Sequence, residues 1–497
     1  MPRHPASHDL ILDPPMGGAA IRMYRIGHGD CFLLSFLGQE GKVFVLIDCG
    51  YKPGSEKCLP IKTSADDVVA DIRRVTDGKL NVVVVTHEHQ DHLNGFTEER
   101  FKGFEIGHLW FSWVESESDQ LANALRRRHE GQLRGLSAAR SRLAANGSPT
   151  AARIDEMVAL EIGGEQEGLT TEELCAAGRF TNKSALAMLR SKIQGLPRCI
   201  YPHQEIVRVP GVDFVRVFAL GPPHDENAIA DLEPRGGEAF PRTFSDSLPD
   251  MSFEAALGGR ETFAPFAGRY ATRLDRVGES EELSSWYDRH YGRGEESNDD
   301  DDVVSGNAKF RRIEHDWLHS ADRMAMAMGE FTNNSSLVLA FELGKGGKVL
   351  LFAGDAQRGN WASWAAKDFP DSEGDVNVRE LLGRTVLYKV GHHGSHNATL
   401  QGRTQDDYPN LAWLGRNRHA EEFAAMVPAV RKWAIETAGW DHPLPSISQA
   451  LKVKCGERVI QTDTDLAHNA EGTHAMIDFM SRTRSTPLYF DYVVMPD

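Results

Sequence analysis

The sequence predicts a layered α/β protein, and three features carry this prediction. The run NVVVV at 81–85 is a short, unbroken β-branched segment, which is typical of a strand buried on both faces. The segment 21–50 contains three more apolar runs separated by turns at GHGD and GQEG, and we expect an antiparallel pair across GQEG. Residues 64–76 have the pattern of a helix, so strands and helices alternate.

Further strands are expected on both sides of a long interval. HLWFSWV at 108–114 predicts a strand after the valine run, and EIVRVPGVDFVRVFAL at 205–220 predicts a return to strand structure. From 332, TNNSSLVLAFELGKGGKVLLFAGDAQ predicts two strands joined by a Gly-rich turn, and TVLYKV at 385–390 predicts another.

Two long segments interrupt this alternation. Residues 115–200 predict helices, and their basic stretch at 124–147 either contacts a phosphate backbone or forms a solvated helix face. Residues 225–330 are irregular and include the acidic run EESNDDDD. We therefore expect an N-terminal extension at 1–20 and one domain at 21–497, whose two insertions could bind a protein partner.

The composition is that of a globular protein from a reducing compartment. The net charge of -17 argues against a broad basic surface for duplex nucleic acid. No signal peptide is recognisable, and no segment reaches the roughly 18 apolar residues of a membrane span. The six cysteines form no CxxC pair and are expected to be free thiols. These features predict a cytoplasmic protein without a membrane partner.

A dense group of histidines and acids follows the valine run. In THEHQDH, His87 and His89 are two residues apart in extended backbone, so their side chains leave on the same side. Asp91 and His92 follow at the turn. Imidazoles and a carboxylate at a strand end predict a site for a divalent metal, above all zinc, with manganese or iron as alternatives.

Three other predicted strands also end in residue types that bind metals. Asp355 ends the strand in FAGDA, and the pair His392 and His393 follows TVLYKV. Strand ends that run alike meet at one edge of a sheet, so these groups are expected to converge with the histidine cluster. Asp48 ends an earlier strand, where it either supports a metal ligand or only forms a turn.

These residues together resemble the signature of the metallo-β-lactamase superfamily. Within it, the chain is similar to the soluble hydrolase domain of the competence protein ComEC. That similarity rests on RIGHGDCFLL, NNSSLVL, FAGDA, KVGHHGS and GWDHPLPSISQALKVKCGERVIQTDTD. The matching blocks cover about 21–110, 205–225 and 330–465. The resemblance implies a four-layer αββα sandwich with large, mainly helical or irregular insertions and a metal site at one edge of its sheets.

The resemblance also implies how the metal-binding residues divide. His87 and His89 would bind a first metal, and Asp91 and His92 a second. Asp355 would bridge both metals.

One histidine of the pair after TVLYKV would complete the second site. We favour His392 over His393, because His392 directly follows the strand.

Several positions depart from the family pattern or leave two roles open. Asn333 and Asn334 stand where two-metal members commonly have a histidine, so the first site could lack a ligand, and His224 could replace it. His28 stands where ComEC-like proteins tend to have glutamine, and it is either a substrate contact or a turn residue. His442 in WDHP either reaches the site or begins a helix.

The predicted function is metal-dependent hydrolysis. One or two divalent ions would lower the pKa of water from about 16 to about 7, so that hydroxide attacks the substrate. The residues expected to act in catalysis are Asp91, Asp48 and His442. We expect a phosphodiesterase or nuclease acting on nucleic acid or a nucleotide. The alternatives are a lactonase or other acyl hydrolase, and a partner-binding protein with a degenerate or structural metal site.

Overall fold

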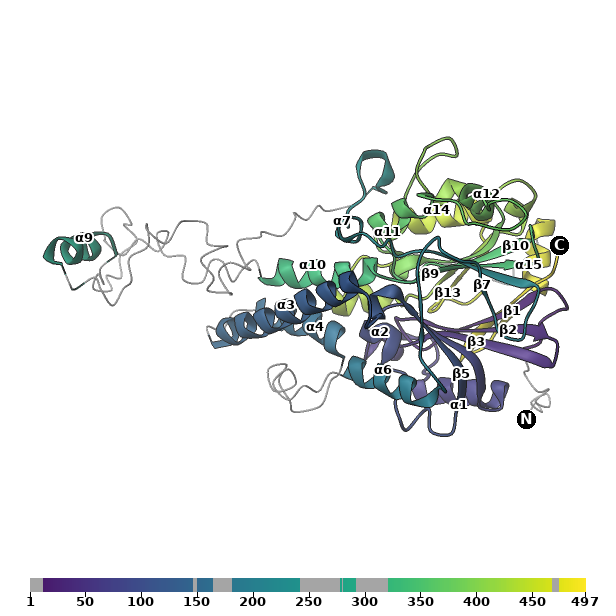
Figure 1. The fold of residues 1–497 in the computed structure, drawn as a ribbon, viewed down its shortest axis with the longest axis horizontal. Coiled ribbons are helices and arrows are strands. Elements are labelled where there is room, and N and C mark those ends of the chain that lie inside the picture. Colours follow the sequence, from purple (N-terminus) through teal and green to yellow (C-terminus); the bar gives the residue numbers. More distant parts are fainter. Residues whose placement is uncertain are drawn as a thin grey trace.

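Two β-sheets form the centre of the structure (Figure 1). The computed structural model describes residues 12–145, 150–163, 181–241, 278, 280–291, 321–466 and 473–497. These residues form a mixed α/β protein, which confirms the predicted α/β class.

The first sheet has eight strands in the order β14-β15-β1-β2-β3-β4-β5-β6, and it joins both ends of the chain. β3 to β6 run parallel, whereas β14, β15, β1, β2 and β3 pair antiparallel. The expected hairpin across GQEG is therefore confirmed as β2 and β3. The strands are β1 Ala19–Tyr24, β2 Cys31–Gly38, β3 Gly41–Cys49, β4 Lys79–Val85, β5 Glu105–Ser112, β6 Arg198–Ile200, β14 Thr483–Ser485 and β15 Tyr489–Val494.

The second sheet has seven strands in the order β13-β12-β11-β10-β9-β8-β7. β10 to β13 run parallel, and β7 to β10 pair antiparallel. The strands are β7 Val207–Arg208, β8 Val215–Gly221, β9 Val338–Leu343, β10 Lys348–Phe352, β11 Thr385–Lys389, β12 Ala424–Val427 and β13 Val459–Gln461.

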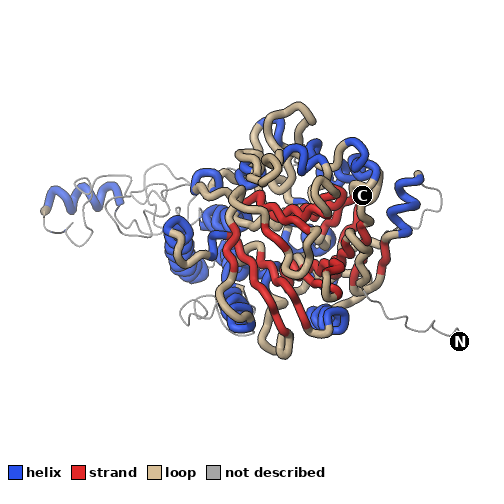
Figure 2. The backbone as a smooth tube through the Cα atoms, turned by 45° about the vertical axis from the view of Figure 1, so that its right-hand side comes forward, coloured by secondary structure: helices blue, strands red, loops and turns tan. Residues whose placement is uncertain are grey.

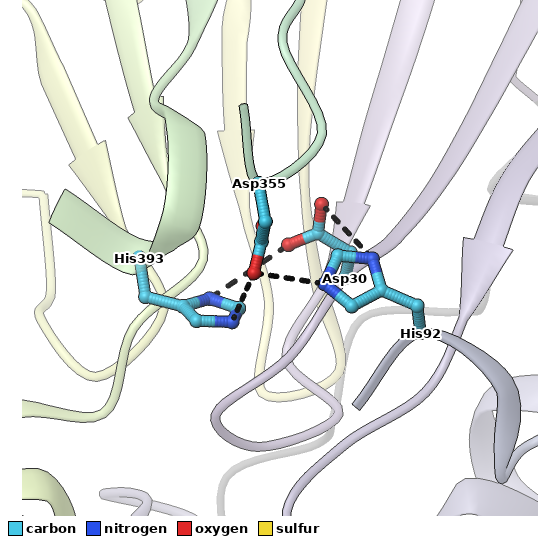
Figure 3. A group of neighbouring side chains, drawn as sticks. All are labelled: Asp30, His92, Asp355 and His393. Carbon is cyan, nitrogen blue, oxygen red and sulfur yellow. Dashed lines mark ion pairs between the residues drawn. The ribbon is translucent and has the colours of Figure 1, made fainter. Parts of the chain in front are cut away.

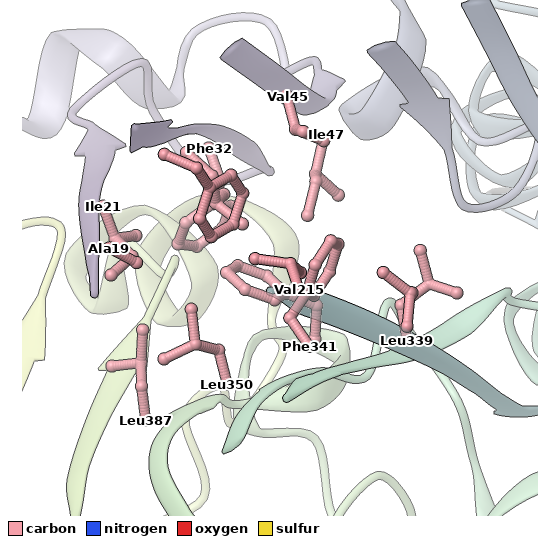
Figure 4. Packing of buried hydrophobic residues seen from close by; sticks show 14 of the residues in the cluster. Ala19, Ile21, Phe32, Val45, Ile47, Val215, Leu339, Phe341, Leu350 and Leu387 are labelled. Carbon is pink, nitrogen blue, oxygen red and sulfur yellow. The ribbon is translucent and has the colours of Figure 1, made fainter. Parts of the chain in front are cut away.

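The main apolar core lies between the two sheets (Figure 4). The valine run of β4 shows how one strand serves two cores, because its side chains alternate between faces. Val82 and Val84 pack in the core between the sheets, whereas Val83 and Val85 pack with the helices on the outer side of the first sheet. β4 is therefore buried on both faces, as its unbroken apolar run predicts.

Helices pack on the outer side of each sheet, so the strands lie in the middle of the molecule (Figure 2). α1 Ala65–Thr76 and α6 Thr181–Lys192 pack on the first sheet. α1 begins after Ser64, whose hydroxyl accepts a hydrogen bond from the Asp67 N–H and forms a capping box. The helices on the second sheet are α11 Arg358–Ser363, α12 Val378–Gly383 and α14 Pro445–Cys455.

Three further helices form what we call the helical layer: α3 Gln120–Ala145, α4 Thr150–Ile162 and α10 Ala321–Asn334 (Figure 1). They share an apolar core that includes Leu136, Ile154 and Met328. α3 and α4 belong to the predicted insertion 115–200, and α10 begins in the predicted insertion 225–330. Two segments that lie far apart in the sequence thus form one packed unit.

Some boundaries differ from the sequence prediction. Residues 332–334 end α10, and β9 begins only at Val338, because the helix is held by the apolar core of the helical layer. β5 ends at Ser112, where a 3-10 turn begins. The acidic run at 295–302 lies outside the described residues. The other α-helices of the described ranges are α2 Gln90–Leu93, α7 Glu226–Ile229, α9 Glu281–Tyr291, α13 Arg431–Trp433 and α15 His474–Ser481.

None of the helices in the described ranges is both long and apolar enough to pass through a lipid bilayer. The described cysteines are free thiols, as their scattered positions predict. They are Cys31, Cys49, Cys58, Cys199 and Cys455.

A buried ion-pair network fastens the two ends of the chain to α1. The fully buried Arg22 in β1 donates to both oxygens of Asp491 in β15, at 2.6 and 2.8 Å. It also donates to Asp71 of α1 at 2.6 Å. Removing the guanidinium would take the nearest counter-charge from Asp491 and one of two arginine partners from Asp71, which is costly for buried carboxylates.

Arg22→Ala is therefore expected to lower the free energy of unfolding by about 3–5 kcal/mol. Arg198→Ala removes an exposed ion pair with Glu205 and should cost no more than about 1 kcal/mol. Denaturant unfolding of both variants measures the difference. Equal, small losses in the two variants would contradict the stabilising role of the network.

Candidate metal centre

The candidate site lies where strand ends from both sheets meet. In the first sheet, β3 ends next to Asp48, and β4 leads into His87 and the short helix α2. In the second sheet, β10 leads to Asp355, and β11 leads to the turn that carries His393. β3 pairs parallel with β4, and β10 with β11, so the carboxyl ends of each pair share one edge.

Four buried side chains form a group that could hold a metal ion: Asp30, His92, Asp355 and His393 (Figure 3). One possible ligand atom from each lies within 4.8 Å of the others. Asp355 Oδ2 is 3.3 Å from His92 Nε2 and 3.6 Å from His393 Nε2. Two imidazoles and two carboxylates form a donor set that suits zinc, manganese or iron.

Lys389 supplies a buried positive charge beside the two carboxylates. Its Nζ lies 2.5 Å from Asp30 Oδ2 and 3.3 Å from Asp355 Oδ1. Burial alone would lower the pKa of Lys389, but the two carboxylates outweigh burial and raise it. Asp30 Oδ1 remains a buried atom that has no hydrogen-bond partner in the described part of the chain.

The N–H groups of His92 and His393 are already used, which determines the nitrogen that each ring can offer. His92 Nδ1 donates to Asp48 Oδ2 at 2.7 Å. His393 Nδ1 donates to the Pro428 carbonyl at 2.8 Å. Since each acceptor holds the N–H of the ring, the neutral imidazole offers its Nε2 lone pair. Histidines that bind metals are held in this way.

The first two histidines of the HEHQDH motif are held similarly. The Thr86 hydroxyl donates to Asp48 at 2.7 Å, so it can accept from His87 Nδ1 at 3.1 Å. The buried Nε2 of His87 finds no hydrogen-bond partner among the described residues. His89 Nε2 donates to Glu161 Oε1 at 2.8 Å, which leaves Nδ1 as the nitrogen available to a metal.

Asp91 presents a buried carboxylate to the same space. Its Oδ2 lies 3.2 Å from His393 Nε2 and 3.8 Å from Lys52 Nζ, and its Oδ1 has no hydrogen-bond partner in the described ranges. Burial would raise the pKa of Asp91, but Lys52 and His393 hold it well below its usual value. Buried oxygen and nitrogen atoms without partners are costly, so their convergence here fits a site for a cation.

The charges around His92 lead to the same conclusion. Burial would lower the pKa of His92, yet neighbouring carboxylates outweigh burial and raise it well above its usual value. These carboxylates are Asp355, Asp30 and Asp48. A site that favours the protonated form of a buried imidazole so strongly has excess negative charge, which a metal ion can neutralise in place of the proton.

Backbone strain and close packing fix the loops that carry these groups. Asp48, His392 and His393 have left-handed φ angles of 54°, 41° and 52°, which residues other than glycine rarely adopt. A Cβ atom at Gly50 would overlap the Asp91 backbone, so only glycine allows this approach.

The histidine pair after β11 divides between two positions. The structure places His393, rather than the predicted His392, in the group of Figure 3. The left-handed backbone at both residues redirects the chain after β11. His392 Nε2 lies 3.1 Å from Asn333 Nδ2, and burial lowers the pKa of His392 to about 3. Asn334 binds backbone carbonyls of α7, including that of Ile229 at 2.6 Å, and so supports the fold.

The other three candidate positions differ in how near they are to this group. The ring centroid of His28 is 4.4 Å from that of His393, and His442 stacks on His28 at 6.1 Å. Both therefore border the group. His224 pairs with Asp119 at 2.9 Å and is not a member of the group.

Asp48 lies behind the group, where it supports His92 by accepting its Nδ1–H.

Sequence reasoning missed Asp30, Lys389 and Glu161. Asp30 follows the GHG turn and Lys389 lies in TVLYKV, so strand-end position could have indicated both. Glu161 had no such signal, because it belongs to a helix 72 positions from its partner His89.

Neither a scan against models of known protein families nor a search of curated proteins finds a match for this chain.

Asp355→Ala is expected to weaken zinc binding by more than about 100-fold, since even groups that only orient a ligand change affinity by 10–100-fold. Competition titration with a chromogenic chelator measures the affinity. The control is Asp375→Ala, which removes an exposed carboxylate and should bind zinc as the native chain does. Unchanged affinity in Asp355→Ala would exclude this group as the metal site.

Proposed function

We propose that this protein is a metal-dependent hydrolase of the metallo-β-lactamase type and that its substrate bond is a phosphodiester. The observation that carries the proposal is the set of histidines whose N–H groups are bound to acceptors, leaving one nitrogen each for a metal. These histidines are His87, His89, His92 and His393, and Asp355 groups with the last two.

The arrangement of the sheets supports this assignment. Two sheets share a core, helices cover the outer face of each, and the candidate ligands lie at the carboxyl ends of strands. We infer from this that the fold is the four-layer αββα sandwich of that superfamily, with the helical layer added at one edge.

Some residues of the site would bind the cation, and another would accept a proton. One or two divalent ions, of which zinc suits the donor set best, would supply Lewis acidity that polarises the phosphoryl oxygen and stabilises the leaving oxygen. Asp91 would accept a proton from the attacking water at Oδ1, which has no hydrogen-bond partner among the described residues. Asp48 would keep His92 in one orientation.

The rim of the site favours a nucleotide or nucleic acid over a small ester. Trp440 and His442 are half-buried, with ring centroids 5.6 Å apart, and Lys52 Nζ lies 5.3 Å from the Trp440 ring. Flat rings and a positive charge beside a phosphate-binding centre are the features that bind a base and its backbone.

Asp91→Asn is expected to lower kcat/KM on bis(4-nitrophenyl) phosphate and on linear single-stranded DNA by about 10²–10⁴-fold, the usual contribution of a positioned proton acceptor. Assays would contain zinc or manganese. The matched control is Asp407→Asn, which changes an exposed aspartate and should keep native activity.

Parallel assays on a nitrophenyl ester and a lactone separate the competing functions. Hydrolysis of the ester or lactone alone would replace the phosphodiesterase assignment with an acyl hydrolase. No turnover of any substrate by metal-loaded protein would contradict a hydrolase and favour partner binding.

A further inference from the structure

A buried carboxylate from the helical layer contacts His89 of the HEHQDH motif. Glu161, near the end of α4, is nearly fully buried, and its Oε1 accepts from His89 Nε2 at 2.8 Å. Both residues lie in the interior, so this hydrogen bond is protected from competition with water.

The second oxygen of Glu161 is held by the other two helices of the same layer. Glu161 Oε2 lies 2.7 Å from His129 Nε2 of α3 and accepts from the Thr332 hydroxyl of α10 at 3.1 Å. All three helices therefore fix one carboxylate group, which leaves it little freedom to turn away from His89.

A separate contact joins the end of α4 to the motif loop. The buried Asn182 of α6 donates to the Glu88 carbonyl at 2.7 Å and to the Glu161 carbonyl at 3.1 Å. One amide group thus links the backbone between His87 and His89 to the backbone of Glu161. The position of the helical layer and the position of the motif are coupled.

We propose that the helical layer is part of the metal centre and that Glu161 is a positioning residue for His89. The inference rests on the proposed metal-dependent function. By accepting the Nε2–H of His89, Glu161 fixes the ring orientation and leaves Nδ1 as the ligand nitrogen. A carboxylate bound to the second nitrogen also makes the imidazole a stronger ligand.

The test compares zinc affinity and the cobalt(II) absorption spectrum in the native chain, Glu161→Ala and Glu161→Gln. We expect Glu161→Ala to weaken zinc binding about 10–100-fold and to change the cobalt spectrum. Glu161→Gln retains an acceptor oxygen and nearly the same volume, so its zinc affinity should lie between those of Glu161→Ala and the native chain. Because this variant keeps the packing, it shows that the loss in Glu161→Ala is not caused by misfolding. The matched control is Asp155→Asn, which weakens an ion pair with Arg140 between α4 and α3 and should bind zinc normally.

A double-mutant cycle with His89→Ala separates positioning from general destabilisation. Because Glu161 acts through His89, Glu161→Ala should have little further effect on zinc affinity once His89 has been removed. An equal loss in both backgrounds would overturn the positioning role, as would native affinity in Glu161→Ala. If the native chain itself bound no zinc, the proposed metal function would fail and this inference with it.

Discussion

The need to pair buried charges is the constraint on which this structure depends. Aspartates, histidines and a lysine lie together at an edge where two sheets meet, largely shielded from water. Each charge must therefore find a partner within the group. Lys389 neutralises part of the negative charge, and Asp48, Glu161 and the Pro428 carbonyl accept the imidazole N–H groups. Among the described residues, the buried atoms that find no hydrogen-bond partner here include Asp30 Oδ1, Asp91 Oδ1 and His87 Nε2, a set that could bind a cation.

The rest of the fold provides the rigidity that such pairing requires. Parallel strands from each sheet end at the same edge, and their cores on both sides prevent those ends from shifting. Left-handed residues and a glycine without room for a side chain then set the final turns. A histidine held within a few tenths of an ångström is useful to a metal, and loops alone rarely provide that precision.

The sequence predicted the parts of this arrangement that depend on local pattern. The valine run, the HEHQDH turn and Asp355 were recognisable because strand periodicity and strand-end position are local properties. The position of His393 in the group could not be recognised from the sequence, because it depends on a left-handed turn that residue type does not reveal. Glu161 was missed for a different reason: its contact with His89 arises only when two helices of one insertion pack against a third from another.

X-ray absorption at the zinc edge of the reconstituted native protein tests whether zinc binds at this sheet edge. We expect a shell of nitrogen and oxygen at about 2.0–2.1 Å, with imidazole scattering and no sulfur. Removal of His393 or Asp355 should diminish that shell. A sulfur shell at about 2.3 Å would place zinc on cysteines instead, and the absence of stoichiometric zinc would contradict a metal centre at this sheet edge.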